Sequence, residues 1–154
     1  MTNKPETVRE EDLIQRKDSL YYKKYAKVAF TGISEEFSEN GQLEVRGNYK
    51  NGQREGLHES FHEKGQLSFR TNYKNGKREG LHEGYSNFTR LSLRENLLLR
   101  ENYKNGKRDG LTEIYIKGQL KIRKTYVDGH LKMKQLNYST RKQISIFLTK
   151  GGNG

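Results

Sequence analysis

The chain has 154 residues, of which 31% are hydrophobic and none is cysteine. This length predicts one domain, the low apolar content predicts a thin core, and the lack of cysteine excludes a disulfide framework and a thiolate metal site. The formal net charge is +11, and residues 101–154 alone carry 12 basic and 4 acidic side chains. Such an excess predicts a partner with an acidic surface, which can be a protein, a nucleic acid or an anionic membrane.

The N-terminal region is polar. Residues 1–10 are expected to be disordered. They contain no apolar run, so we expect no signal peptide or membrane-spanning segment, and a soluble, reducing, cytoplasmic location. Residues 11–27 are expected to cap the domain, either as a short helix or as a first hairpin that turns near Lys17-Asp18. The three tyrosines of this segment favour a strand.

One sequence motif recurs along the middle of the chain. Asn-Tyr-Lys-Asn-Gly occupies residues 48–52, 72–76 and 102–106, and a degenerate copy, Thr-Tyr-Val-Asp-Gly, occupies residues 125–129. Self-similarity of this kind predicts a repeat architecture. We place repeats at about 28–52, 53–76, 77–106 and 107–129, inside a single domain of residues 11–148. Stacked repeats form extended surfaces more readily than catalytic pockets, so we expect no enzyme and no cofactor.

Each repeat is predicted to be a β-hairpin. Asn-Gly favours the type I′ turn, which needs a positive φ at both central residues, and a second turn such as Lys64-Gly65 lies about 12 residues away from it. The predicted fold is all-β: an elongated, twisted antiparallel meander of stacked hairpins. Alternation along the strands, with Val45 and Tyr49 on one side and Arg46 on the other, predicts one apolar and one polar face.

Equivalent residues of neighbouring repeats should lie roughly 10 Å apart, because each repeat contributes two strands. The basic residues beside the Asn-Gly turns therefore predict a row of cations along one edge of the sheet. We expect this row to steer the encounter with an acidic partner; the alternative is that basic turns keep the sheet soluble and block edge pairing. The row consists of Lys74, Lys77, Arg78, Lys104, Lys107 and Arg108.

The third repeat contains six extra residues within 86–96, and insertions in repeat proteins often lie on the binding face. This segment is predicted either to select the partner or to form a lengthened hairpin that packs on its own sheet. The usual hot-spot residue types give the expected partner-binding set. The set is Tyr49, Tyr73, Tyr103, Phe88, Arg90, Leu91 and Arg94.

The C-terminal region is expected to close the sheet. Residues 130–148 form the predicted second cap, with a strand at Gln143–Leu148, and residues 149–154 form a flexible tail. The histidines do not predict a metal site, because His58 and His62 would lie about 13 Å apart along one strand.

The repeated unit Tyr-Lys-Asn-Gly-Lys-x-x-Gly, with an x-Gly-Gln-Leu turn before the next copy, resembles the MORN repeat over about residues 20–130. More closely it resembles the bacterial MORN-repeat-variant proteins, which act as antitoxin or immunity components. This resemblance implies an elongated sheet, no catalytic centre and a toxin or effector as the partner. Eukaryotic MORN proteins imply membrane association or scaffolding instead.

The first functional hypothesis is a non-enzymatic protein-binding module that blocks an effector by surface occlusion. It would be an antitoxin, an immunity protein, or a phage or host inhibitor. The second is a nucleic-acid-binding protein that uses the basic sheet edge and stacks bases on tyrosine. The third is a membrane-surface scaffold, which positive charge supports but for which the sequence offers no amphipathic helix or lipidation signal.

Overall fold

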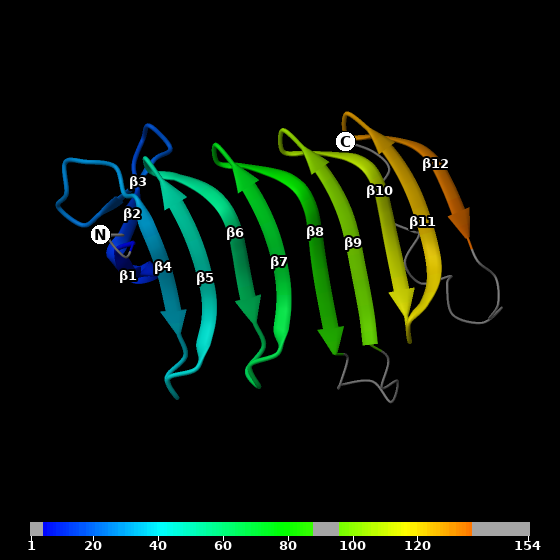
Figure 1. The fold of residues 1–154 in the computed structure, drawn as a ribbon, viewed down its shortest axis with the longest axis horizontal. Helices are drawn as coiled ribbons and strands as arrows, with labels where there is room; N and C mark the ends of the chain where they lie inside the picture. Colours follow the sequence, from blue (N-terminus) through cyan, green and yellow to red (C-terminus); the bar gives the residue numbers. More distant parts are fainter. Residues whose placement is uncertain (1–4, 88–95, 137–154) are drawn as a thin grey trace.

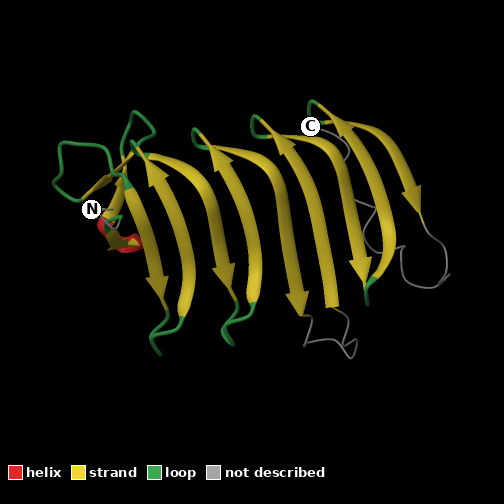
Figure 2. Cartoon of the chain, viewed as in Figure 1, coloured by secondary structure: helices red, strands yellow, loops and turns green. Residues whose placement is uncertain are grey.

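The computed structural model describes residues 5–87 and 96–136. Ten strands form one sheet in the order β1-β4-β5-β6-β7-β8-β9-β10-β11-β12, and β2 and β3 pair separately. Figures 1 and 2 show strands β4 to β12 side by side in a single layer. The strands are β1 (Thr7–Arg9), β2 (Leu13–Gln15), β3 (Tyr21–Lys23), β4 (Gly32–Phe37), β5 (Leu43–Lys50), β6 (Gln53–Phe61), β7 (Leu67–Lys74), β8 (Lys77–Asn87), β9 (Asn96–Lys104), β10 (Lys107–Ile116), β11 (Gln119–Val127) and β12 (His130–Leu136).

The expected all-β meander is confirmed, since β4 to β12 pair antiparallel in chain order. Two expectations for the N-terminus are resolved. Residues 13–23 form a hairpin, β2–β3, preceded by a 3₁₀ helix at Glu10–Asp12. Residues 7–9 are not disordered, because β1 adds to the sheet in parallel with β4. The Ile33 amide also donates to the Glu6 carbonyl, at 2.8 Å.

The Asn-Gly turns have the predicted geometry, with positive φ at both Asn75 (50°) and Gly76 (75°). Each turn is also tied to the preceding repeat. The Gly76 amide donates to the Arg54 carbonyl at 2.9 Å, and the Asn75 amide donates to the Glu55 carboxylate at 2.7 Å. The same two bonds recur one repeat later, through Arg78 and Glu79 to Gly106 and Asn105, and again through Arg108 and Asp109 to Gly129 and Asp128.

The register corrects the predicted faces. Residues directly opposite in an antiparallel pair share a face. Leu57 is opposite Asn72, whereas His58 is opposite Thr71, two residues before Tyr73. Leu57 therefore lies on the face of the sheet opposite to that of Phe69 and Tyr73, so the apolar residues are divided between the two faces rather than gathered on one. We call the face with Tyr49, Tyr73, Tyr103 and Tyr126 the tyrosine face.

The N-terminal segment covers one end of the tyrosine face. Tyr49 is only 4% exposed, and its ring lies 5.0 Å from Tyr21 and 5.8 Å from Phe30, measured between centroids. The backbone of the first Asn-Gly turn is bonded to this segment, because Gly52 donates to Phe30 at 2.7 Å and accepts from Tyr21 at 2.8 Å. The buried aromatic cluster of the described residues thus lies at this end, as expected for a capping segment.

Candidate functional site

Acidic and basic side chains alternate across the sheet on the side opposite the tyrosine face. Arg70 is opposite Glu59 on one side and Glu83 on the other, and Glu83 is in turn opposite Arg100. We call this row the charge ladder and this side of the sheet the ladder face. From β4 to β11 the charge ladder consists of Glu35, Arg46, Glu59, Arg70, Glu83, Arg100, Glu113 and Arg123.

Glu83 is the centre of the charge ladder. It is 1% exposed, and its carboxylate accepts hydrogen bonds from Arg70 Nε at 2.6 Å and Arg100 Nε at 2.9 Å. Burial raises the pKa of Glu83, but the hydrogen bonds from both arginines outweigh it, so the pKa lies below its ordinary value. The carboxylate therefore stays charged beneath its two partners.

The charge ladder is close to neutral in composition but presents cations to solvent. The side chains of its arginines are 43–47% exposed, whereas their ion-paired glutamates, Glu35, Glu83 and Glu113, are 19%, 1% and 14% exposed. Arginine carries five N–H donors, so each guanidinium keeps donors for a further acceptor. The surface seen by a partner is therefore a row of arginines on every second strand.

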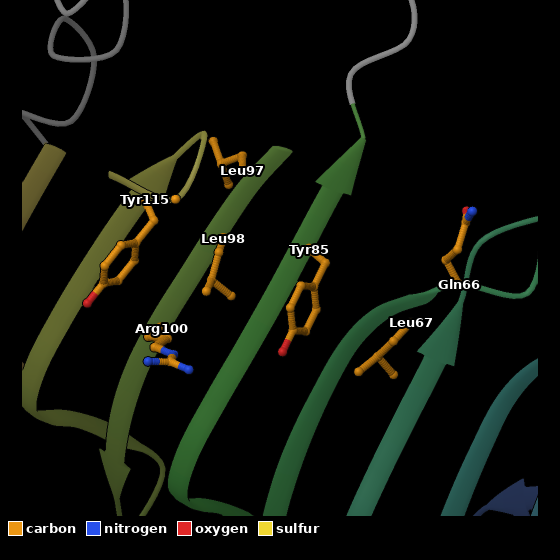
Figure 3. Close-up of a pocket in the computed structure, with 8 residues that line it drawn as sticks. Gln66, Leu67, Tyr85, Leu97, Leu98, Arg100 and Tyr115 are labelled. Carbon is orange, nitrogen blue, oxygen red and sulfur yellow. The ribbon is translucent and has the colours of Figure 1, made fainter. Parts of the chain in front are cut away.

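A hollow of about 670 Å³ opens beside the charge ladder (Figure 3). Four successive strands, β7 to β10, contribute one residue each to this hollow: Leu67, Tyr85, Leu98 and Tyr115. Arg100 borders them. The Arg100 guanidinium lies 5.9 Å from the centroid of the Tyr115 ring, and Tyr115 donates to the Glu113 carboxylate at 3.0 Å. Aliphatic, aromatic and guanidinium groups thus meet on one open surface, the residue types that dominate protein interfaces.

The tyrosine face carries a second regular row, in which arginines stack on tyrosines. The guanidinium carbons of Arg54, Arg78 and Arg108 lie 5.5, 5.2 and 5.4 Å from the ring centroids of Tyr73, Tyr103 and Tyr126. Burial tends to lower the pKa of Arg54, but its contacts with the tyrosines outweigh burial, so the pKa lies above its ordinary value. These arginines act as packing groups of the sheet.

The predicted row of cations is therefore divided between the faces. Arg78 and Arg108 lie on the tyrosine face, because neighbouring residues of a strand point to opposite sides. The lysine pairs Lys74–Lys77 and Lys104–Lys107 lie on the ladder face and are exposed. Lys107 Nζ forms an ion pair with Asp128 at 2.8 Å, so the edge is not purely basic.

The expected partner-binding tyrosines differ in exposure. Tyr49 is buried under the N-terminal segment and does not offer its ring to a partner, which corrects the prediction. Its hydroxyl donates to Glu10 at 3.2 Å, and burial raises the pKa of Tyr49 to about 12. Tyr73 and Tyr103 are half-buried, and their role remains a prediction.

Most of the insertion, with Phe88, Arg90, Leu91 and Arg94, lies outside the described residues. What is described is a longer hairpin, in which β8 and β9 stay paired to Ser86 opposite Leu97 and Asn87 opposite Asn96. In the other hairpins with an x-Gly turn the register shifts near this end, for example between Ser60 and Phe61. Part of the insertion thus extends the sheet next to the hollow.

His58 and His82 lie within the packing of the sheet. His58 lies between the rings of Tyr49 and Tyr73, at 5.3 and 4.9 Å, and its Nε2 is 2.8 Å from the Asn48 carbonyl. His82 Nδ1 bonds the Thr71 hydroxyl at 2.5 Å. Across residues 5–87 and 96–136, no group of three acidic, histidine or cysteine side chains could hold a metal ion.

We predict a loss of stability in mild acid. Burial lowers the pKa of His58, so the folded protein holds the imidazole neutral to a lower pH than the unfolded chain does. Stability is full above the unfolded-state pKa of about 6.5; as the pH falls below it, the unfolded chain takes up a proton that the folded chain refuses. Denaturant titrations of His58→Gln should show a flatter decline between about pH 7 and pH 5 than the unaltered chain. His130→Gln, at an exposed site on β12, should leave the decline unchanged.

In the described part of the chain, no helix is long and apolar enough to cross a membrane. The family model of the MORN repeat variant matches residues 30–51 and 54–75, which are the β4–β5 and β6–β7 hairpins. The resemblance is thereby confirmed for two adjacent repeats. No curated protein and no solved structure matches the chain. MORN repeats are in general non-enzymatic modules that bind proteins or membranes.

Proposed function

We propose that this chain is a non-enzymatic inhibitor that binds an effector protein and blocks it by surface occlusion, in the manner of an antitoxin or immunity protein. The observation that carries the proposal is the open hollow on the ladder face, lined by Leu67, Tyr85, Leu98 and Tyr115 beside Arg100. Tyrosine and arginine are the residue types that most often carry binding energy at interfaces. An open face of this kind suits occlusion of a surface more than enclosure of a small substrate.

The lysines of the ladder face provide the second part of the mechanism. Lys74, Lys77, Lys104 and Lys107 are exposed at the Asn-Gly end of this face, at the opposite end of the strands from the hollow, and they would draw an acidic effector to the face as a whole. The proposed contacts with the effector also include Phe88, Arg90, Leu91 and Arg94 of the insertion. Tyr73 and Tyr103, on the tyrosine face, remain proposed contacts as well. The proposed location is the cytoplasm, where such an effector would act.

A nucleic-acid partner is the second candidate, and the exposed lysine pairs favour it. The tyrosines argue against it, because Tyr49 is buried and Tyr73 and Tyr103 carry arginines on their rings rather than free faces for bases. The ion pair between Lys107 and Asp128 also weakens the positive field at this edge. We therefore rank a protein partner first.

The test is to co-express the chain with each protein encoded by the neighbouring genes, and to measure growth and complex formation. We expect one neighbour to be toxic alone, to lose its toxicity with the chain, and to co-elute with it. Association should slow as salt rises from about 0.05 to 0.2 M, because long-range steering is screened.

Two results would contradict the inhibitor. One is that no neighbouring product binds the chain or is neutralised by it. The other is a mobility shift with DNA or RNA that persists at about 0.2 M salt, which would favour the nucleic-acid candidate.

A further inference from the structure

We propose that the element that docks on the ladder face is an acidic amphipathic helix of the partner protein, lying across strands β7 to β10. The proposal rests on the proposed function, since it names the part of the effector that would be bound. It is carried by the exposed arginines of the charge ladder and by the apolar row that runs parallel to them.

The charge of the surface selects an acidic partner. Arg70 and Arg100 are 47% and 45% exposed, while Glu83, which pairs with both of them, is 1% exposed. A carboxylate from outside therefore meets the guanidinium groups before it meets the buried acid. Arginine binds carboxylates through two parallel hydrogen bonds, which adds geometric specificity to the attraction.

The spacing of the arginines selects a helix. Arg70 lies on β7 and Arg100 on β9, two strands apart, so they repeat at about 9.6 Å across the sheet. Seven residues of a helix rise about 10.5 Å and return to the same face, so carboxylates seven residues apart match this distance. In a partner segment with the extended conformation, residues three apart also span about 10 Å, but their side chains point to opposite sides. Successive carboxylates at that spacing would therefore not all face the sheet.

The apolar row supports the same orientation. Tyr85, Leu98 and Tyr115 follow one another across β8, β9 and β10, and Leu98 is two residues from Arg100 along β9. Two residues of a strand cover about 6.8 Å, whereas a helix with its side chains is about 10 Å wide. One helix can therefore place acidic residues on the arginines and apolar residues in the hollow at the same time.

The rest of the chain does not complement this surface. Residues 88–95 contain two basic residues and one acidic residue, residues 137–154 contain three basic residues and no acidic residue, and a second copy carries a net charge of +11. A nucleic acid would supply phosphates, and bases that stack on tyrosine, but no aliphatic side chain to pack on Leu67 and Leu98. An acidic helix supplies both groups, so we commit to it as the occupant.

The probe is a synthetic amphipathic helix of about 22 residues, with a leucine stripe and glutamates seven residues apart on the same face. Binding to the full chain is measured by fluorescence anisotropy of the labelled peptide. Two peptides serve as controls: one has lysine in place of each glutamate, and the other has the same composition with its glutamates moved to the far side. We expect the first peptide to bind at least about tenfold more tightly than either control.

The chain offers a matched pair of variants. Arg100 pairs with Glu83 at 2.9 Å, and Arg108, on the tyrosine face, pairs with Glu101 at 2.7 Å; both arginine side chains are 45% exposed and both acids are buried. Arg100→Gln should weaken binding of the acidic peptide about tenfold or more, and Arg108→Gln less than about twofold. Leu98→Glu leaves the charge ladder intact and should also abolish binding, which keeps the test valid if Arg100→Gln folds poorly.

Equal binding of both acidic peptides would overturn the proposal, because it would show unspecific charge attraction. Equal losses in Arg100→Gln and Arg108→Gln would overturn it as well, and so would tighter binding of DNA on the ladder face. If an effector complex survives Arg100→Gln and Leu98→Glu while the peptide does not bind, this inference fails and the inhibitor stands. If the peptide binds as expected and no effector is found, the inhibitor fails and the docking surface stands.

Discussion

Replacing Glu83 by alanine is expected to lower the free energy of unfolding by about 2–3 kcal/mol. The carboxylate is 1% exposed and accepts from Arg70 and Arg100, so its loss leaves a void and two unpaired guanidinium groups in the middle of the sheet. Removing one partner of a fully buried pair costs about 3–5 kcal/mol, and the value is reduced here because both arginines reach water. Chemical denaturation followed by circular dichroism measures the change.

Glu113→Ala is the matched control for Glu83→Ala. Glu113 occupies the equivalent position of the charge ladder two strands away, but it is 14% exposed and pairs with the half-exposed Arg123. Its replacement should cost about 1 kcal/mol, as for ion pairs near the surface. Equal losses at the two positions would show that the burial of Glu83 contributes nothing to the ladder.

Replacing Gly52 by alanine is expected to detach the N-terminal segment and to cost about 2–4 kcal/mol in unfolding free energy. Gly52 has a φ of +76°, and a Cβ there would lie 2.8 Å from Leu20 Cβ and 3.0 Å from Ala29 Cβ. The variant therefore carries backbone strain and a clash with the capping segment. Trypsin should cut the segment faster, and the Tyr49 hydroxyl should titrate below its pKa of about 12, because Tyr49 loses its cover.

Gly76→Ala separates the two contributions. Gly76 holds the same turn position one repeat later with a φ of +75°, and the nearest atom to its Cβ would be Gln53 Cβ at 3.9 Å. This variant should cost about 1 kcal/mol, the strain alone, and leave the N-terminal segment protected from trypsin. If Gly52→Ala is as stable as Gly76→Ala and its N-terminal segment is as well protected from trypsin, the capping segment does not depend on the first turn.

The sequence predicted the fold well because its strongest signals are local. A type I′ turn is specified by two adjacent residues, and the positive φ of Asn75 and Gly76 follows from their identities. The contacts between repeats were less accessible to the sequence. The Glu55 carboxylate, for example, accepts a hydrogen bond from the Asn75 amide of the next turn. Such a contact joins residues 20 positions apart, and no local pattern specifies it.

The sequence contains a signal for the charge ladder, but the alternation of apolar and polar residues along each strand is not enough to reveal it. An arginine precedes each turn tyrosine by three residues, as at Arg70 and Tyr73, and a glutamate follows the Gly-Leu pair of each next strand, as at Glu83. Whether these residues face one another depends on the register, and a shift of one residue moves a whole set of side chains to the other face. The extra residues beside Gly56 and Gly80 set that register.

The sequence by itself determined the repeats, the turns, the antiparallel meander and the excess of positive charge, because each follows from composition or from residues close together in the chain. The tertiary structure alone decided three things. The lysines of the turn edge lie on one face of the sheet and its arginines on the other. Tyr49 is buried, and Glu83 lies beneath two arginines beside an open hollow. The physical reason is that face, burial and ion pairing are properties of neighbouring strands, which the register brings together and which no single strand contains.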